Sequence, residues 1–135
     1  MPVLEQLLEQ YPGQVKIVFK HFPLRNHAFA YKAAQATIAA QKQGKFWPFH
    51  DLLFKKYKQI NDARIVEIRN ILNLDIPKFE SEMKAPHTSA RINGDVADGQ
   101  EAGVRGTPTV FINGVLLRNK SPSGFRQGIA KALEP

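Results

Sequence analysis

Apolar residues recur at helical spacing at both ends of the chain. The first set precedes Pro12-Gly13, a pair that ends helices, so residues 2–11 are expected to form an amphipathic helix. A second set predicts a last helix, for which Ser121 and Ser123 offer caps. The positions are Val3, Leu4, Leu7, Leu8 and Tyr11 at the start, and Phe125, Ile129 and Leu133 at the end.

A period of two replaces this pattern in two places. Residues 15–20 put Val15, Ile17 and Phe19 on one face before Phe22-Pro23 interrupts the run, and they predict a strand. Residues 109–112 and 115–118 predict two short strands around Asn113-Gly114. This dipeptide suits a two-residue hairpin turn, in which both central positions have positive φ.

Between these β segments the pattern predicts successive helices. Residues 26–43 are rich in alanine and end at Gly44, and residues 46–57 carry an aromatic stripe that is expected to be core. Further helices are expected at 62–73, from Asp75 to Met83, and at 88–102. The chain has no internal repeat and no linker, so the sequence predicts one α/β domain with a helical insertion.

Composition narrows the function classes. The 135 residues are 43% hydrophobic with a net charge of +7, and no segment approaches the roughly 18 apolar residues of a membrane span. Because the charges are spread and Lys55-Lys56 is the one adjacent basic pair, a solvated basic surface is a better interpretation than nucleic-acid binding. Residues 1–5 do not resemble a signal peptide, so the chain as written would stay in the cytoplasm. With no cysteine, disulfides and thiolate catalysis are excluded.

Other chemistry is not indicated. The four histidines, His21, His27, His50 and His87, do not form a zinc motif, and His50 is expected to be a hydrogen-bonded packing residue. Asn93 to Gly99 resembles a calcium loop, but Asp98 stands at the required glycine. Gly99, Gly103 and Gly106 lack the Gly-Lys-Ser/Thr of a phosphate-binding loop. Neither a metal nor a cofactor is expected.

Three stretches in order resemble the DsbA-like branch of the thioredoxin superfamily. They are Val15–Leu24 followed by His27, Gly44–Phe54, and Gly103–Gly114 with its Gly106-Thr107-Pro108-Thr109 segment. The resemblance implies a thioredoxin-like α/β fold, with residues 1–24 and 88–135 as the thioredoxin parts and 25–87 as a helical insertion. It implies a cis bond before Pro108, which would expose the backbone of Thr107 to an extended substrate peptide. Arg105, Gly106, Thr107 and Pro108 are the implied binding residues.

The Cys-X-X-Cys motif of that family has no counterpart here. In the family, a strand leads into this motif at the start of the first helix, and this chain looks as if it begins within that helix, N-terminally truncated. Loss of that strand would leave a gap of roughly 9 to 10 Å between residues 15–20 and 109–113. We therefore expect the sheet to close differently, elements to be exchanged with a second copy, or the chain to be marginally stable.

Two functions follow. The resemblance implies a thiol-disulfide oxidoreductase acting on proteins in its full-length form, from a family that is usually extracytoplasmic; this cysteine-free chain would be redox-inactive. The alternative is a non-catalytic module that binds a peptide or a partner protein. The expected partner in both is an extended polypeptide, with self-association through unpaired sheet edges, and neither nucleic acid nor membrane is expected.

Overall fold

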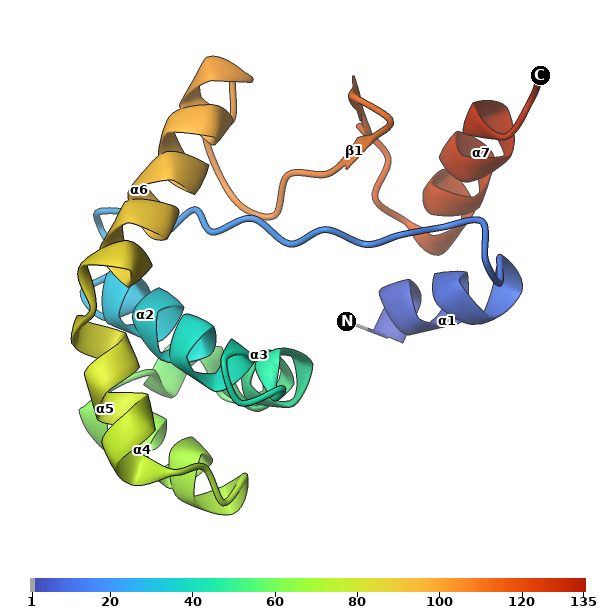
Figure 1. Ribbon diagram of the computed structural model, residues 1–135. Coiled ribbons are helices and arrows are strands. Elements are labelled where there is room, and N and C mark those ends of the chain that lie inside the picture. Colours follow the sequence, from blue (N-terminus) through green and yellow to red (C-terminus); the bar gives the residue numbers. More distant parts are fainter. Residues whose placement is uncertain (1) are drawn as a thin grey trace. The chain divides into compact units, whose positions relative to one another are not determined.

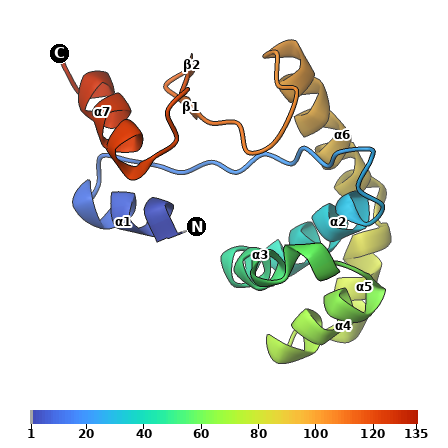
Figure 2. The same cartoon turned by 180° about the vertical axis from the view of Figure 1, so that it is seen from behind.

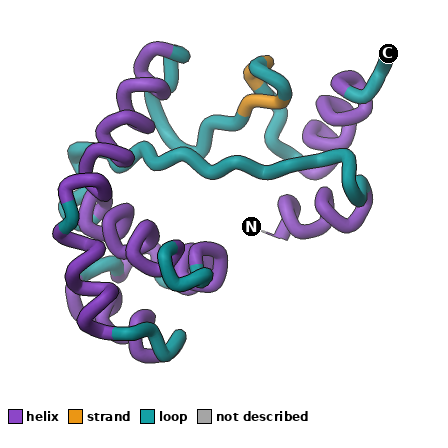
Figure 3. The backbone as a smooth tube through the Cα atoms, viewed as in Figure 1, coloured by secondary structure: helices purple, strands orange, loops and turns teal. Residues whose placement is uncertain are grey.

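The architecture is that of a computed structural model that describes residues 2–135. The chain divides into two compact units, one made of the residues up to Phe19 with Val104–Pro135, and the other of Lys20–Gly103. Helices predominate, and the strands are confined to one short hairpin (Figure 1, Figure 3). Residues 20–24 and 88–103, which the sequence placed with the thioredoxin part, belong to the second unit; the predicted single domain stays a prediction.

The unit Lys20–Gly103 contains only helices and turns. Its helices are α2 (Ala30–Gln41), α3 (Phe46–Lys55), a 3-10 turn (Tyr57–Gln59), α4 (Asp62–Ile71), α5 (Ile76–Lys84) and α6 (Pro86–Glu101). Each predicted helix is present, although α2 begins four residues late because His27 and Ala30 donate backbone hydrogen bonds in turns. Gly44, with a φ of 74°, ends this segment as expected.

Small side chains on α2 organise the core of this unit. Because alanine lets helix backbones approach closely, α3 and α5 pack against α2, and the Phe49 and Phe79 rings lie 5.8 Å apart. A second cluster joins Ile38 of α2 to Ile92 of α6. The main cluster consists of Ala33, Ala36, Ala39, Ala40, Phe49, Leu53, Ile65, Ile68, Leu74, Phe79 and Met83.

The aromatic stripe is core only in part, so that prediction was wrong for three residues. Phe49 and Leu53 are buried, whereas Trp47, Phe54 and Tyr57 are 39%, 57% and 61% exposed. At about 100° per residue the stripe covers about 160° of the helix surface, which is wider than one packed face. Tyr57, moreover, lies beyond the last residue of α3.

The other unit contains α1 (Pro2–Gln10), the hairpin of β1 (Phe111–Ile112) and β2 (Val115–Leu116), and α7 (Pro122–Ala132). The turn is as predicted, with φ values of 48° at Asn113 and 81° at Gly114. The Ser121 hydroxyl caps α7 by accepting the N–H of Gly124 at 3.1 Å. Helices α1 and α7 lie next to each other in both views (Figure 1, Figure 2) and contribute the buried apolar cluster of this unit, Leu7, Phe125 and Ile129.

Residues 15–20 do not form the predicted strand. Their side chains alternate as expected, with Val15, Ile17 and Phe19 half-buried and the intervening ones exposed. Within the described residues, however, the backbone of residues 15–18 makes no hydrogen bond, and β1 pairs only with β2. A strand requires a partner ladder, which alternation alone cannot supply. Of the three expected outcomes, an alternative pairing of residues 15–20 within the sheet is therefore not observed in the part of the chain that the structure describes. Exchange of elements with a second copy and marginal stability stay predictions.

Candidate functional site

The four predicted site residues lie together on the loop between α6 and β1. The bond between Thr107 and Pro108 is cis, as the sequence predicted. Arg105, Thr107 and Pro108 are exposed, and Gly106 is half-buried. The loop therefore presents a short, largely exposed segment directly before the hairpin.

Hydrogen bonds hold this loop on both sides of Thr107. The Thr109 hydroxyl donates to the carbonyl oxygen of Gly106 at 2.7 Å, and the Lys120 ammonium donates to that of Pro108 at 2.7 Å. Among residues 2–135, no hydrogen bond involves the backbone N–H or C=O of Thr107. Such groups form hydrogen bonds with solvent or with a docked chain, and an extended peptide presents the complementary groups.

Lys120 contacts the candidate loop, and the sequence analysis did not single it out. It is twelve residues from Pro108, and neither composition nor motif marks it. A signal did exist, because the hairpin pairs Phe111 with Leu116 and Ile112 with Val115. Followed outward from the ladder, the same register predicts that Lys120 returns close to the loop, where its ammonium contacts Pro108. The position of the Asn-Gly turn therefore helps to predict that Lys120 lies near the loop, because the turn sets the register of the two strands.

The acidic residues that resembled a calcium loop lie on α6, where they contact Lys20 and His21 in the segment before α2. Asp95 accepts the backbone N–H of His21 at 3.0 Å, and Asp98 accepts the ammonium of Lys20 at 2.6 Å. The hydrogen bond to Asp98 raises the pKa of Lys20. A helix cannot provide the curved ligand set of a calcium loop. In the described part of the chain, no cluster of three metal-ligating side chains exists.

Two histidines of the helical unit are buried. Burial lowers the pKa of His21 to about 4, although the nearby Asp95 carboxylate acts in the opposite direction. Burial also lowers the pKa of His50, and the hydrogen bond to Asp51 at 3.2 Å opposes that shift. The His50 ring lies 4.4 Å from the Phe54 ring, which confirms it as a hydrogen-bonded packing residue.

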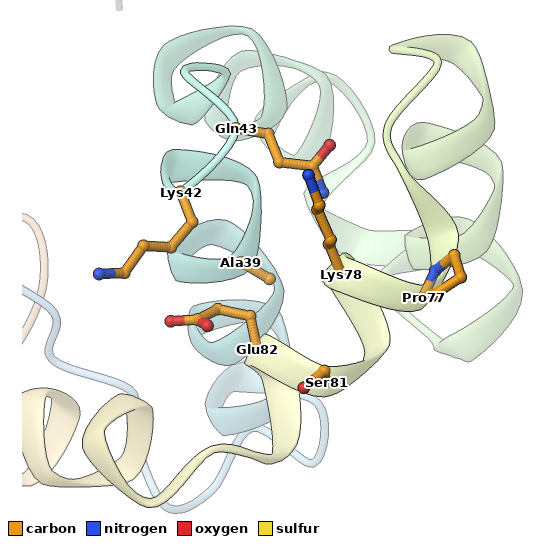
Figure 4. A pocket seen from close by; sticks show the side chains of 7 residues that line it. All are labelled: Ala39, Lys42, Gln43, Pro77, Lys78, Ser81 and Glu82. Atoms are coloured by element: carbon orange, nitrogen blue, oxygen red, sulfur yellow. The ribbon is translucent and has the colours of Figure 1, made fainter.

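A pocket of about 390 Å³ lies between the end of α2 and helix α5 (Figure 4). Two of its polar lining side chains form hydrogen bonds within the protein. The Gln43 amide makes two hydrogen bonds with the backbone of Asp75, and Glu82 pairs with His87. The side chains that line this pocket do not form a recognisable catalytic arrangement. The lining residues are Ala39, Lys42, Gln43, Pro77, Lys78, Ser81 and Glu82.

No helix within residues 2–135 is both long and apolar enough to cross a membrane.

Comparison with known proteins extends the resemblance over nearly the whole chain. A family model described as thioredoxin matches residues 2–131. The crystal structure of a thioredoxin-like oxidoreductase from Silicibacter pomeroyi has a TM-score of 0.85 and 26% identity, covering 98% of this chain and 76% of that one. The thiol-disulfide exchange protein alpha-DsbA2 from Wolbachia pipientis has a TM-score of 0.84 at 23% identity, covering 97% and 72%. The latter likeness shows the fold alone.

Curated relatives are much longer than this chain. The Na(+)/H(+) antiporter NhaA 3 of Salinispora tropica is 36% identical over 114 residues, which are 84% of this chain and 17% of the relative. The Na(+)/H(+) antiporter NhaA of Herminiimonas arsenicoxydans is 29% identical over 114 residues, or 84% and 18%. The chain spans less than a fifth of the length of these relatives, so their names carry no activity over to it.

Proposed function

The chain belongs to the thioredoxin family and has a DsbA-like thioredoxin fold, and from this premise we propose that its Arg105–Pro108 loop binds an extended polypeptide. Such binding is the substrate-holding part of thiol-disulfide exchange. The observation that carries the proposal is the backbone of Thr107, exposed and without a hydrogen bond among residues 2–135, on a loop fixed on both sides. An added extended chain would pair with this backbone as a strand does.

The redox step requires groups that these residues do not contain. Exchange proceeds by attack of a thiolate on a disulfide sulfur, which forms a mixed disulfide and releases the other sulfur as a thiolate. Since the 135 residues include no cysteine, we propose that this chain alone binds without turnover. The dithiol would have to come from residues outside these 135 or from another protein. A purely non-catalytic peptide-binding module makes the same contacts and lacks that dithiol.

Two measurements test these statements separately. In an insulin-reduction turbidity assay with dithiothreitol, the chain should give the same rate as dithiothreitol alone, and a clearly faster rate would overturn the redox-inactive assignment. For binding, an extended peptide should shift the amide resonances of Gly106, Thr107 and Thr109 in a titration followed by nuclear magnetic resonance. The same peptide N-methylated at alternate amides is the matched control, because it keeps its side chains and loses its donors. Equal shifts with both peptides, or none, would contradict backbone pairing.

A further inference from the structure

In the segment that contains the Thr107 loop, all charged side chains are positive. Residues 104–133 contain five basic side chains and no aspartate or glutamate. None of the five forms an ion pair within the part of the chain that the structure describes. The acidic residues of this unit are elsewhere, Glu5 and Glu9 on α1 and Glu134 after α7. The five basic residues are Arg105, Arg118, Lys120, Arg126 and Lys131.

Two of these cations lie beside the backbone that would receive the peptide. The Lys120 ammonium is 2.7 Å from the carbonyl oxygen of Pro108, the residue that follows Thr107. Arg105 is exposed two residues before Thr107, at most about 7 Å along an extended chain. Each cation is exposed, so each can meet a ligand charge at little desolvation cost.

From this arrangement we infer that the polypeptide bound at Thr107 is acidic, with aspartate or glutamate side chains directed at Lys120 and Arg105. The inference rests on the proposed function. In an extended peptide, alternate side chains lie on one side about 6.6 to 6.8 Å apart, a spacing at which two carboxylates can meet separate cations. Exposed ion pairs change affinity by about two- to fivefold each, and complementary potentials also speed encounter.

The test compares two fluorescent peptides of equal length, one acidic and one with each aspartate and glutamate replaced by its amide. Anisotropy titrations are run in 50 mM and 500 mM NaCl. The acidic peptide should bind about tenfold more tightly at low salt, and the difference should shrink to about twofold at high salt, because the Debye length falls from about 13 Å to about 4 Å.

Charge variants locate the effect. K120E and R105E should each weaken the acidic peptide about five- to tenfold, and by a larger factor than they weaken the neutral peptide. K120Q keeps a hydrogen-bond donor for the Pro108 carbonyl without the charge and should lose about two- to fivefold, whereas K120R should retain binding. The matched control is K131E, which makes the same charge change at the far end of α7, about 15 Å from Ser121 along the helix.

The outcomes separate the two proposals. Equal, salt-insensitive affinities for both peptides, with shifts in the 105–109 amides, would overturn the acidic preference and leave peptide binding intact. A loss with K131E as large as that with K120E would also overturn it, since the attraction would then follow net charge. Absence of amide shifts with either peptide would instead refute the proposed function. Circular dichroism of each variant identifies unfolding.

Discussion

The two units of this protein differ in how they bury apolar surface. The helical unit surrounds α2 with eleven buried residues in one cluster and adds a second cluster through Ile38 and Ile92. Among the residues described, the other unit buries three large apolar side chains, those of Leu7, Phe125 and Ile129, and half-buried side chains surround them. The helical unit is thus expected to be the more stable, because fully buried side chains contribute most to the free energy of unfolding.

The difference follows from how each backbone satisfies its hydrogen bonds. Helices form theirs locally, and residues 20–103 are contiguous. The other unit joins two distant segments, and its extended residues 15–18 make no backbone hydrogen bond within the described chain. Local pairing therefore completes one unit, whereas the other depends on contacts between remote parts of the sequence.

The largest expected effect tests the two cores against each other. Phe49→Ala in the helical unit should lower the free energy of unfolding by about 3–5 kcal/mol, because it removes a completely buried ring that packs on Phe79. Leu7→Ala in the other unit should cost about 2–3 kcal/mol, since half-buried neighbours can collapse into the space. Urea denaturation measures both. An equal or larger loss for Leu7→Ala would contradict the comparison.

Acid should weaken the helical unit through His21. Its pKa is about 4 in the folded protein and about 6.5 when unfolded, so the unfolded chain binds the proton first as the pH falls. This contribution is complete above pH 6.5 and is lost between pH 6.5 and 4, by up to about 3 kcal/mol. His21→Gln should therefore show a flatter profile of unfolding free energy between pH 7 and 4.5. A parallel profile in the variant would rule out His21 as the source.

The next largest effect on stability is expected at Gly124, which lies close to the backbone of Asn119. A Cβ at Gly124 would lie 2.0 Å from the backbone oxygen of Asn119, so Gly124→Ala should cost about 2–3 kcal/mol in unfolding free energy. Gly128→Ala is the matched control on the same helix, because its nearest neighbours are the mobile side-chain ends of Ile112 and Leu117. Its cost should be about 1 kcal/mol or less. Thermal denaturation that ranks the two in the opposite order would contradict the geometry.

The smallest effect compares one helix cap in each unit. Asn61 accepts the N–H of Arg64 at 2.8 Å at the start of α4, and Ser121 accepts that of Gly124 at 3.1 Å at the start of α7. Each substitution to alanine should cost about 1 kcal/mol. Hydrogen exchange should show the loss mainly in the unit that contains the altered cap. A change spread evenly over both units would mean that they unfold together.

Most of the correct predictions from the sequence concern features that depend on neighbouring residues. The helix expected from Asp75, the cap Ser121 and the Asn113-Gly114 turn depend on neighbouring residues only, and all three are present. Residues 15–20 show the limit, because alternation identifies a face but not a pairing partner. The aromatic stripe shows another, since spacing does not reveal how wide the packed face of a helix is.

The candidate site was predictable to a similar extent. Arg105 to Pro108 follow from a contiguous motif, and the cis bond before Pro108 agrees with it. Lys120 required a further step, because its position depends on the hairpin folding back on itself. The charge around the loop was visible in the sequence as a run without acidic residues, but only the fold relates that run to Thr107.

The unpaired residues 15–18 also bear on how the protein behaves in concentrated solution. An exposed apolar strand edge recruits like segments from other molecules, and charged residues within such a segment counteract this. Here Lys16 is exposed two residues before the exposed Val18, so two stacked copies would bring ammonium groups together. This repulsion weakens as salt screens it. Colloidal stability should therefore be greatest at low ionic strength.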